Sequence, residues 1–292
     1  MKDVSIIIVN YNTSALIKNL LDSLYEKTEG ISYEVIVVDN KPTEQFTIDL
    51  KDYLDKIIYL PLKENLGFGR ANNEGLKVAK GKNIFFLNPD TLLLNNAIKL
   101  LSDYLDNHEE VGVCGGNLFD AELNPTHSYQ MTFPSLAWEL NLLLGKSIWF
   151  RLLYGRSFTF NYSQKHKEVA YITGADMMVK RHVLECVGAF NPAFFMYYEE
   201  TELSYRIHKA GYKIINMPEV KILHLEGKSI QTNFAKQQML LSSRKTYYKL
   251  TIGKKYIHDV LCKFTFWIRL VAATLRGSQE EITYWKNSIK LV

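Results

Sequence analysis

The stretch VSIIIVNYN (residues 4–12), together with VIVVDN (35–40), decides the fold. Each begins with an apolar, β-branched run too short for a helix and ends in polar residues, a pattern typical of buried parallel strands. Between the two stretches, leucines recur at helical spacing, at Leu16, Leu20, Leu21 and Leu24. The order strand, helix, strand is the repeating unit of a parallel α/β sheet.

The same alternation continues along the chain. Strands are predicted at Ile57–Leu60, Asn83–Leu87 and Val111–Cys114, with one helix ending near Lys80 and another over Asn95–Tyr104. Residues 1–117 therefore predict a doubly wound nucleotide-binding layout. Ligands of such α/β sheets gather at the carboxyl ends of the strands.

The second half of the chain is less regular. In residues 118–168 the apolar residues no longer follow a strand or helix periodicity, and Trp, Phe, Tyr and Leu are frequent. This composition predicts either a helical pair covering the sheet or an apolar platform for a substrate. Regular structure then returns, as strands at Val169–Thr173, Met177–Lys180, Tyr212–Ile215 and Val220–His224 and helices at His182–Val187 and Glu199–Ala210.

The composition excludes several classes of protein. With 292 residues, 47% hydrophobic and 23% charged, and only 7 Pro and 16 Gly, the chain is neither disordered nor collagen-like. Its three widely spaced cysteines form neither a disulfide framework nor a CxxC metal site, which favours a reducing compartment. The first apolar run is too short for a signal peptide, and no stretch reaches the roughly 18 apolar residues of a spanning helix.

The charge is distributed unevenly. Residues 231–292 contain 11 Lys or Arg and 3 acidic residues, a net charge of +8, whereas residues 1–230 contain 24 basic and 28 acidic residues, a net charge of −4. Such a basic end predicts either an anionic partner, nucleic acid or phospholipid, or simply a solvated face. We therefore expect two parts, residues 1–230 and a basic helical extension over 231–292.

Polar residues follow several of the predicted strands. Asn10, Tyr11 and Asn12 end the first, Asp39 and Asn40 the second, Asn88 and Asp90 the strand at 83–87, and His224 the last. One Asp at a strand end is most often a cap or a turn former. Several such positions converging on one edge of a sheet predict a binding site instead.

A set of motifs makes a family recognisable. The chain resembles the family 2 inverting glycosyltransferases of GT-A fold, particularly the rhamnosyltransferase-like members that build bacterial surface polysaccharides. The matching pieces, which span residues 4–229 in order, are VSIIIVNYN (4–12), VIVVDN (35–40), ENLGFGRANNEGL (64–76), FFLNPDT (85–91), ITGADMMVKR (172–181), FNPAFFMYYEETELSYRIHKAGYKI (190–214) and HLEGKS (224–229).

The resemblance implies a site for a nucleotide-sugar donor. The family holds the base at the first two strand ends, which implies roles for Asn10, Tyr11 and Asp39, with Asp39 accepting from a pyrimidine N3–H. The residues implied to line the rest of the nucleotide are Asn65, Gly67, Phe68, Arg70, Asn73, Asn88 and Asp90. Glycines permit close backbone approach, and Arg70 can offset phosphate charge.

The resemblance also implies a divalent metal ion, Mg²⁺ or Mn²⁺, that assists departure of the diphosphate. In the family the ion rests on the last Asp of a DxD-like element, which here reads Asn88-Pro89-Asp90 and keeps one carboxylate. His224 matches a His that some members add as a further ligand.

The implied catalytic base lies at the start of a helix. The family's ED-x-D element reads Glu199-Glu200-Thr201-Glu202 here, so Glu200 takes the position of the base with one extra methylene, and Glu199 can share the role. The alternative is an acidic first turn that satisfies the helix dipole. The aromatic run 194–198 predicts either core packing or a stacking floor for an acceptor sugar, and the residues implied to face the acceptor are Gly174, Ala175, Asp176 and Tyr198.

The basic end contains one strongly amphipathic segment, Lys255–Arg276. At 100° per residue its apolar side chains fall in one arc, with Arg269 and Arg276 opposite. Such a helix with Trp and Phe can lie in a membrane interface. Packing on the catalytic domain or on a second copy of the chain, as a homodimer, stays open.

Together these features predict an inverting, metal-dependent glycosyltransferase. The resemblance implies transfer of L-rhamnose from a dTDP-sugar, or of another sugar from a UDP-sugar, to a glycan or lipid-linked glycan. We expect a cytoplasmic protein that can contact the inner face of the plasma membrane, and no nucleic-acid partner. The alternatives are a sugar-nucleotide-binding or scaffold protein that has lost catalysis and, last, a nucleotidyltransferase.

Overall fold

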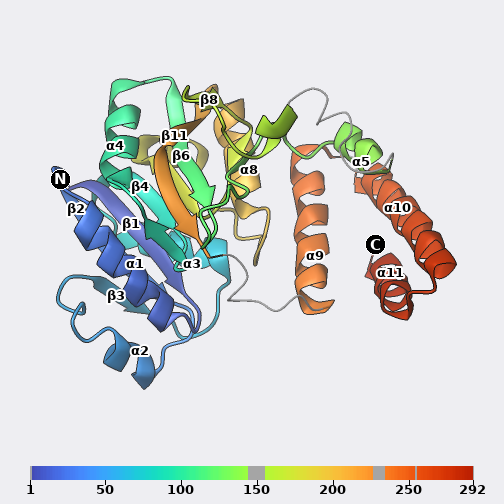
Figure 1. The fold of residues 1–292 in the computed structure, drawn as a ribbon, viewed down its shortest axis with the longest axis horizontal. Coiled ribbons are helices and arrows are strands. Elements are labelled where there is room, and N and C mark those ends of the chain that lie inside the picture. The colour runs from blue at the N-terminus through green and yellow to red at the C-terminus, as the bar shows by residue number, and fades with distance from the viewer. Residues whose placement is uncertain (1, 144–154, 226–233, 254, 292) are drawn as a thin grey trace.

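The computed structural model describes residues 2–143, 155–225, 234–253 and 255–291. Its centre is a nine-stranded sheet in the order β3-β2-β1-β4-β10-β6-β11-β5, with β8 paired to β11 (Figure 1). These strands are β1 (Lys2–Asn10), β2 (Tyr33–Asp39), β3 (Ile58–Pro61), β4 (Gly81–Leu87), β5 (Thr91–Leu93), β6 (Val111–Phe119), β8 (Lys167–Glu168), β10 (Asp176–Lys180) and β11 (Lys213–His224).

The sheet is mostly parallel, as predicted. β1 pairs in parallel with β2 and β4, β2 with β3, and β6 with β11. β10 runs antiparallel to both β4 and β6, and β5 and β8 run antiparallel to β11. The carboxyl ends of β1, β2, β4 and β11 therefore lie at the edge where β10 begins.

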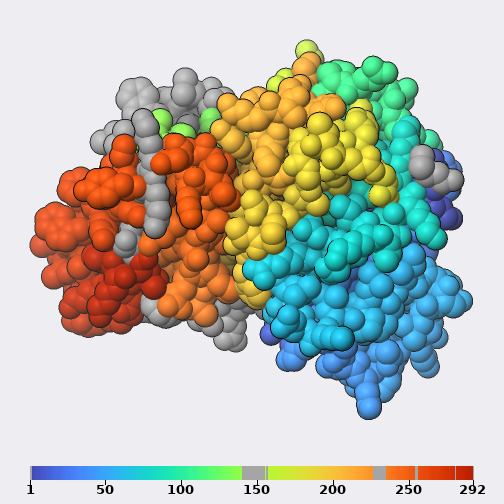
Figure 2. Space-filling model, turned by 180° about the vertical axis from the view of Figure 1, so that it is seen from behind, coloured from blue at the N-terminus to red at the C-terminus, as the bar shows by residue number. Residues whose placement is uncertain are grey.

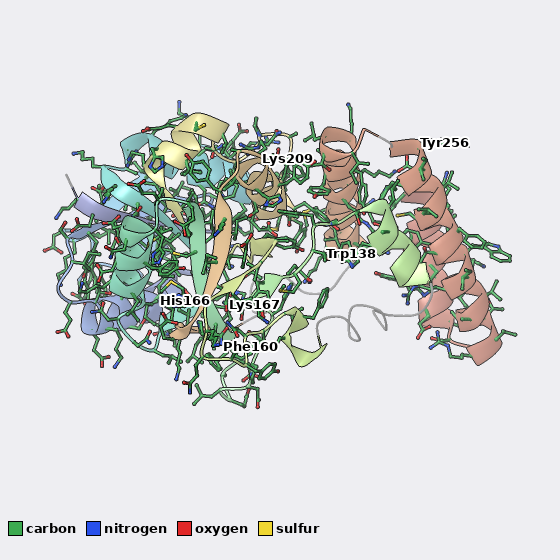
Figure 3. All side chains as sticks on the ribbon, turned by 90° about the horizontal axis from the view of Figure 1, so that it is seen from above. Trp138, Phe160, His166, Lys167, Lys209 and Tyr256 are labelled. Carbon is green, nitrogen blue, oxygen red and sulfur yellow. The ribbon has the colours of Figure 1, made fainter. Side chains whose placement is uncertain are left out.

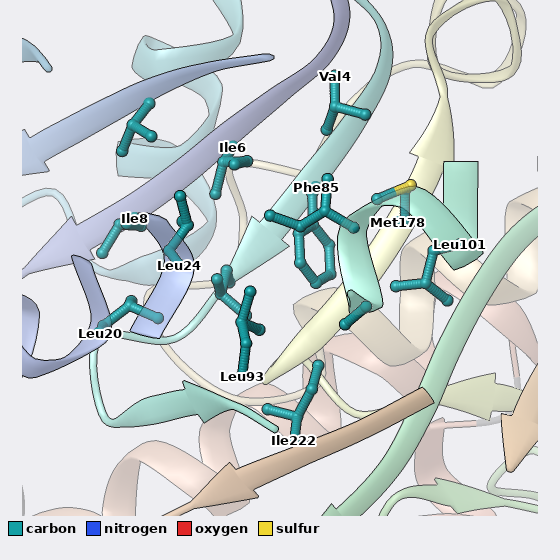
Figure 4. Packing of buried hydrophobic residues seen from close by; sticks show 14 of the residues in the cluster. Val4, Ile6, Ile8, Leu20, Leu24, Phe85, Leu93, Leu101, Met178 and Ile222 are labelled. Atoms are coloured by element: carbon teal, nitrogen blue, oxygen red, sulfur yellow. The ribbon is translucent and has the colours of Figure 1, made fainter. Parts of the chain in front are cut away.

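Helices cover both faces of this sheet. They are α1 (Ser14–Lys27), α2 (Glu44–Asp49), α3 (Phe68–Val78), α4 (Ala97–Asn107), α7 (Arg181–Val187) and α8 (Glu199–Lys209). Alternate residues of β1 point to opposite faces. Ile6 and Ile8 pack with α1 and α4 in one core (Figure 4), and Ile7 packs with α3, α7 and α8 in the other. The α/β class predicted from the sequence is thereby confirmed.

Three details differ from the expectation. Residues 213–224 form the single strand β11, with a register shift between Asn216 and Lys221, where two separate strands were predicted. The strand predicted at Val169–Thr173 shrinks to β9 (Tyr171–Ile172), which pairs with β7 (Tyr129–Gln130) in a sheet of its own. The short strand β5 was not predicted, because three residues are too few to show a period.

The rest of the described chain forms a helical group beside the sheet. It contains α9 (Phe234–Thr251), α10 (Lys255–Arg276) and α11 (Gln279–Leu291), and also α5 (Leu136–Leu143), while the 3₁₀ helix η1 (Gly155–Phe158) lies near the sheet. Figures 1 and 2 show α9 standing between the sheet domain and α10. Figure 3 shows α5, with Trp138, among these helices.

A buried polar cluster holds the helical group together. Glu139 of α5 forms an ion pair with Arg244 of α9 and accepts a hydrogen bond from Tyr248, at 2.8 Å. The imidazole of His258 in α10 stacks on Tyr248, with ring centroids 4.1 Å apart. The aromatic region 118–168 thus supplies helix α5, which packs against α9 and α10, and strand β8, which pairs with β11 in the sheet. Residues 144–154 of that region and the predicted boundary at residue 230 lie outside the described residues.

Candidate active site

The predicted strand-end residues meet at one edge of the sheet. Asn10, the last residue of β1, is the register partner of Asp39, the last residue of β2. β4 ends at Leu87, opposite Asp176 at the start of β10, and β11 ends at His224. The parallel order of the strands brings together residues that are more than two hundred positions apart.

The corner at β1 and β2 is closely hydrogen-bonded. Asn10 Nδ2 donates to Asp39 Oδ1 at 2.7 Å, and Tyr59 Oη donates to Asp39 Oδ2 at 2.9 Å. Asp39 is fully buried, and its Oδ1 also accepts the backbone N–H of Lys41. Tyr11 is exposed beside this corner, with the Lys41 ammonium 5.7 Å from its ring centroid.

The glycine-rich segment is fixed between this corner and the aromatic run. Asn40 Nδ2 donates to Gly67 O, and Asn65 Oδ1 accepts the Gly67 N–H. Gly67 has φ +81°, and a Cβ there would lie 2.0 Å from Phe195 O, so this position requires glycine. The N–H of Phe68 donates to the same Phe195 carbonyl at 2.9 Å.

The next turn of α3 braces the neighbouring loop. Arg70 Nε donates to Pro192 O at 2.9 Å. Asn73 donates to Phe190 O and accepts the Phe190 N–H, at 2.7 and 3.1 Å. The Asn73 amide therefore holds α3 to this loop, and its role in lining the nucleotide stays a prediction.

The predicted metal-binding residues form a second corner. His224 Nε2 lies 3.5 Å from Asp90 Oδ1 and 3.5 Å from Asn88 Nδ2. The side chains of Asp90 and His224 are mostly buried, and β5 fixes them, because Thr91 is the register partner of His224. The N–H of Asn88 donates to Ala175 O at 3.0 Å, which ties this corner to the turn before β10.

The two predicted catalytic carboxyl groups begin α8. The Glu200 side chain lies beside this same turn, since a Cβ on Gly174 would be 3.9 Å from Glu200 Cβ and 3.5 Å from the Phe68 ring. Thr201 Oγ1 donates to Glu200 Oε1 at 3.0 Å. Glu199 points toward α3, where a Cβ on Gly69 would be 3.4 Å from its Cβ. Glu199 is 3% exposed, and its Oε2 has no hydrogen-bond partner in the described part of the chain.

The environment raises the pKa of both carboxyl groups. Burial raises the pKa of Glu199 to about 8, and the nearby charge of Glu200 adds to the rise. Burial also raises the pKa of Glu200. Both carboxyl groups therefore hold a proton more readily than ordinary glutamates do.

The residues immediately before this pair have an unusual backbone. Tyr197 and Tyr198 both adopt left-handed φ angles, 72° and 69°, which are uncommon for bulky residues and must be stabilised by their surroundings. Helix α9 supplies the contacts. Ser243 Oγ donates to Met196 O at 2.7 Å, and the Tyr247 ring packs 5.5 Å from Tyr198.

Sequence reasoning missed these α9 residues, although the adjacent Tyr247 and Tyr248 were a usable signal for a buried helix face. Both tyrosines are fully buried and pack with Phe194 in a cluster of their own. Phe195 by contrast is 38% exposed. The aromatic run thus divides between core packing and an exposed ring.

Three residues implied to face an acceptor make contacts within the protein. Asp176 is fully buried, its Oδ2 accepts the Gly116 N–H, and burial raises the pKa of its carboxyl well above the ordinary value. Ala175 is buried, and Tyr198 packs on Tyr247. These contacts hold the three residues within the protein, and their roles toward an acceptor stay predictions. Gly174 lies beside Glu200.

Comparison with known proteins settles the family. The model of glycosyl transferase family 2 matches residues 5–188. The chain belongs to glycosyl transferase family 2. It is a glycosyltransferase, and the described residues outside the matched range include α8, β11 and the helices of the extension.

Several relatives have assigned activities. The low-salt glycan biosynthesis hexosyltransferase Agl10 of Haloferax volcanii is 27% identical over 77% of this chain and 67% of its own length. The dTDP-rhamnosyl transferase RfbF of Shigella flexneri is 29% identical over 76% of this chain and 68% of its own length. An N-acetylglucosaminyl-diphospho-decaprenol L-rhamnosyltransferase of Mycobacterium tuberculosis is 25% identical over 77% and 76%.

Solved structures confirm the GT-A fold. GalNAc-T7 with UDP, GalNAc and Mn²⁺ aligns with a TM-score of 0.62 at 13% identity, covering 85% of this chain and 50% of that one. The mannosyltransferase PcManGT from Pyrobaculum calidifontis, with GDP-Man and Mn²⁺, aligns with a TM-score of 0.59 at 17% identity, covering 100% and 82%.

Proposed function

We propose that this glycosyltransferase inverts the anomeric centre, with Glu200 as the base. The observation that carries the proposal is the position of Glu200: its Cβ lies beside Gly174, and the adjoining residue, Ala175, accepts a hydrogen bond from the N–H of Asn88 in the metal corner. One turn of chain thus joins the base to the place where a diphosphate would leave.

The proton transfer follows from this arrangement. An acceptor hydroxyl attacks the anomeric carbon from the face opposite the diphosphate, the bond to the diphosphate breaks with its electron pair, and Glu200 takes the hydroxyl proton. The Thr201 hydroxyl fixes one oxygen of Glu200. Burial raises the pKa of Glu199, which disfavours a second negative charge beside the base.

The metal corner fits a divalent ion. Asp90 contributes a carboxylate and His224 an imidazole, with ligand atoms 3.5 Å apart, and Asn88 lies beside them. Oxygen ligands with one imidazole suit Mn²⁺ and also allow Mg²⁺. When bound, such an ion stabilises the charge that develops on the departing diphosphate. The Mn²⁺ in both structural neighbours supports this assignment.

We propose dTDP-L-rhamnose as the donor and a lipid-linked glycan as the acceptor. The support is the dTDP-rhamnosyl transferase and the diphospho-decaprenol rhamnosyltransferase among the relatives. A lipid-linked acceptor would place the protein in the cytoplasm at the inner face of the plasma membrane, which agrees with the charge of +8 over residues 231–292. In the described part of the chain, no helix combines the length and apolarity needed to cross a membrane.

A donor screen tests this function. The full chain is incubated with Mn²⁺ and dTDP-rhamnose, UDP-hexoses or GDP-mannose, and donor binding is measured as a rise in Tm. Transfer to a diphospholipid-linked sugar is then followed, and the anomeric configuration of the product is determined. We expect dTDP-rhamnose to give the largest rise and an inverted linkage. A retained configuration would contradict the role of Glu200.

The Asp90→Ala variant tests the metal corner. Because a bound metal contributes several kcal/mol to such a reaction, we expect kcat/KM to fall roughly 100-fold or more. The matched control is Asp103→Ala, which removes an exposed aspartate of α4. Donor binding without turnover by the unaltered protein would favour the alternative, a sugar-nucleotide-binding scaffold.

A further inference from the structure

Helix α10 turns its apolar side toward solvent. Trp267 is 57% exposed and Leu275 is 83% exposed. At 100° per residue the exposed apolar side chains form one continuous stripe along the helix. We call this stripe the α10 face, and its residues are Tyr256, Ile257, Val260, Phe264, Trp267, Ile268, Val271 and Leu275.

The opposite side of α10 makes the contacts with the protein. Cys262 and Phe266 are buried against α9 and α11, and His258 is buried against Tyr248. The guanidinium of Arg269 lies 5.4 Å from the Trp285 ring centroid. The α10 face therefore stays exposed and does not pack on the described residues of the catalytic domain, which removes one of the three partners that the sequence left open.

We infer that the α10 face docks on an anionic phospholipid bilayer. The inference refines the membrane location proposed above, and it does not depend on which sugar is transferred. The α10 face contains no charged residue, and Lys263 borders it. A helix of 22 residues, about 33 Å long, can lie flat with its Trp and Tyr rings at the level of the headgroups.

Charge selects the bilayer over a second copy of the chain. The extension from residue 231 has a net charge of +8, and Lys249, Lys263, Lys286 and Lys290 are exposed on its helices. Contact between two α10 faces would bring two such extensions together, and their repulsion opposes the hydrophobic gain. An anionic leaflet instead attracts each nearby Lys or Arg by about 1 kcal/mol.

The test measures sedimentation of the full chain with vesicles. Vesicles of phosphatidylglycerol and phosphatidylethanolamine are compared with vesicles of phosphatidylcholine alone, at low and high salt. We expect binding to the anionic vesicles that weakens with salt. The double variant Phe264→Glu, Trp267→Glu should reduce this binding at least tenfold. The control is Ile48→Glu, an equally exposed apolar residue of α2, which should bind as the unaltered protein does.

Separate readouts distinguish this inference from the proposed function. Thermal stabilisation by the donor, and transfer to a water-soluble acceptor where one is used, should be unchanged in the double variant, because α10 does not contribute to the sheet edge. No binding to anionic vesicles, equal binding to neutral vesicles or an equal loss in Ile48→Glu would each overturn the inference. So would a dimer, detected by light scattering, that the double variant abolishes while vesicles bind neither protein.

Discussion

The two corners of the donor edge and the catalytic carboxyl pair are held in place by different means. Asn10 and Asp39 bond to each other at the ends of adjacent strands, and Asp90 meets His224 across paired strands. Glu200 instead follows two tyrosines in left-handed conformations that are packed from outside by α9. The donor edge is thus built by the sheet itself, whereas the position of the base depends on a helix from the far end of the chain.

This difference implies that the two halves of the reaction can be separated. Donor binding should survive damage to the extension. The hydrogen bonds described above for the donor edge, at Asn10, Asp39 and Asn88, do not involve α9. Catalysis should not survive, because displacement of a catalytic group by about 1 Å can reduce the rate about 100-fold. Variants of the pair and of α9 therefore test the comparison directly.

The largest effect is expected from Glu200→Gln. The amide cannot take a proton from the acceptor, so kcat should fall ~10²- to ~10⁴-fold while the Tm rise caused by the donor is kept. Transfer assays and donor titrations measure the two quantities. The control, Glu185→Gln, changes an exposed glutamate of α7 and should be fully active. Full activity of Glu200→Gln would remove that residue as the base.

A smaller loss is expected from Tyr247→Ala. The fully buried ring supports Tyr198, so its removal should lower kcat ~10- to 100-fold with little change in the KM for the donor. Loss of a buried aromatic ring also costs about 3–5 kcal/mol of stability. Tyr247→Phe is the matched control, because it keeps the buried ring that packs on Tyr198 and removes only the hydroxyl. Equal losses of kcat and donor affinity would contradict the separation of donor binding from catalysis. An inactive Tyr247→Phe variant would contradict it as well.

The same contrast explains how much was predictable. Strand-end residues such as Asp39 and His224 could be located from the sequence, because each apolar run shows where its strand ends. Parallel strands then end at the same edge of the sheet. The contact of Tyr247 with Tyr198 could not, because it joins segments 49 residues apart through packing alone. Asp176 carries a motif, yet no pattern showed that β10 would bury its carboxyl group between β4 and β6.

The smallest effect on kcat is expected from Glu199→Gln. Glu199 lies at the contact between α3, which belongs to the donor side, and α8, which carries Glu200. Burial holds the pKa of Glu199 at about 8, above its ordinary value of 4.5, so the folded protein binds this proton more tightly than the unfolded chain does. The contribution of this proton to the free energy of unfolding is fully present below pH 4.5 and is lost as the pH rises through about 8. Glutamine is neutral throughout.

The Tm of Glu199→Gln relative to the unaltered protein should therefore increase by roughly 10 °C between pH 5 and pH 9, because a pKa raised from 4.5 to about 8 is linked to about 4 kcal/mol of stability over that range. Its kcat at neutral pH should fall less than about tenfold, because Glu200 remains as the base. Thermal unfolding at several pH values measures the first quantity. A Tm difference that does not change with pH would show that Glu199 is ionised in the folded protein. A loss of kcat as large as that of Glu200→Gln would instead mean that the two carboxyl groups share the proton transfer.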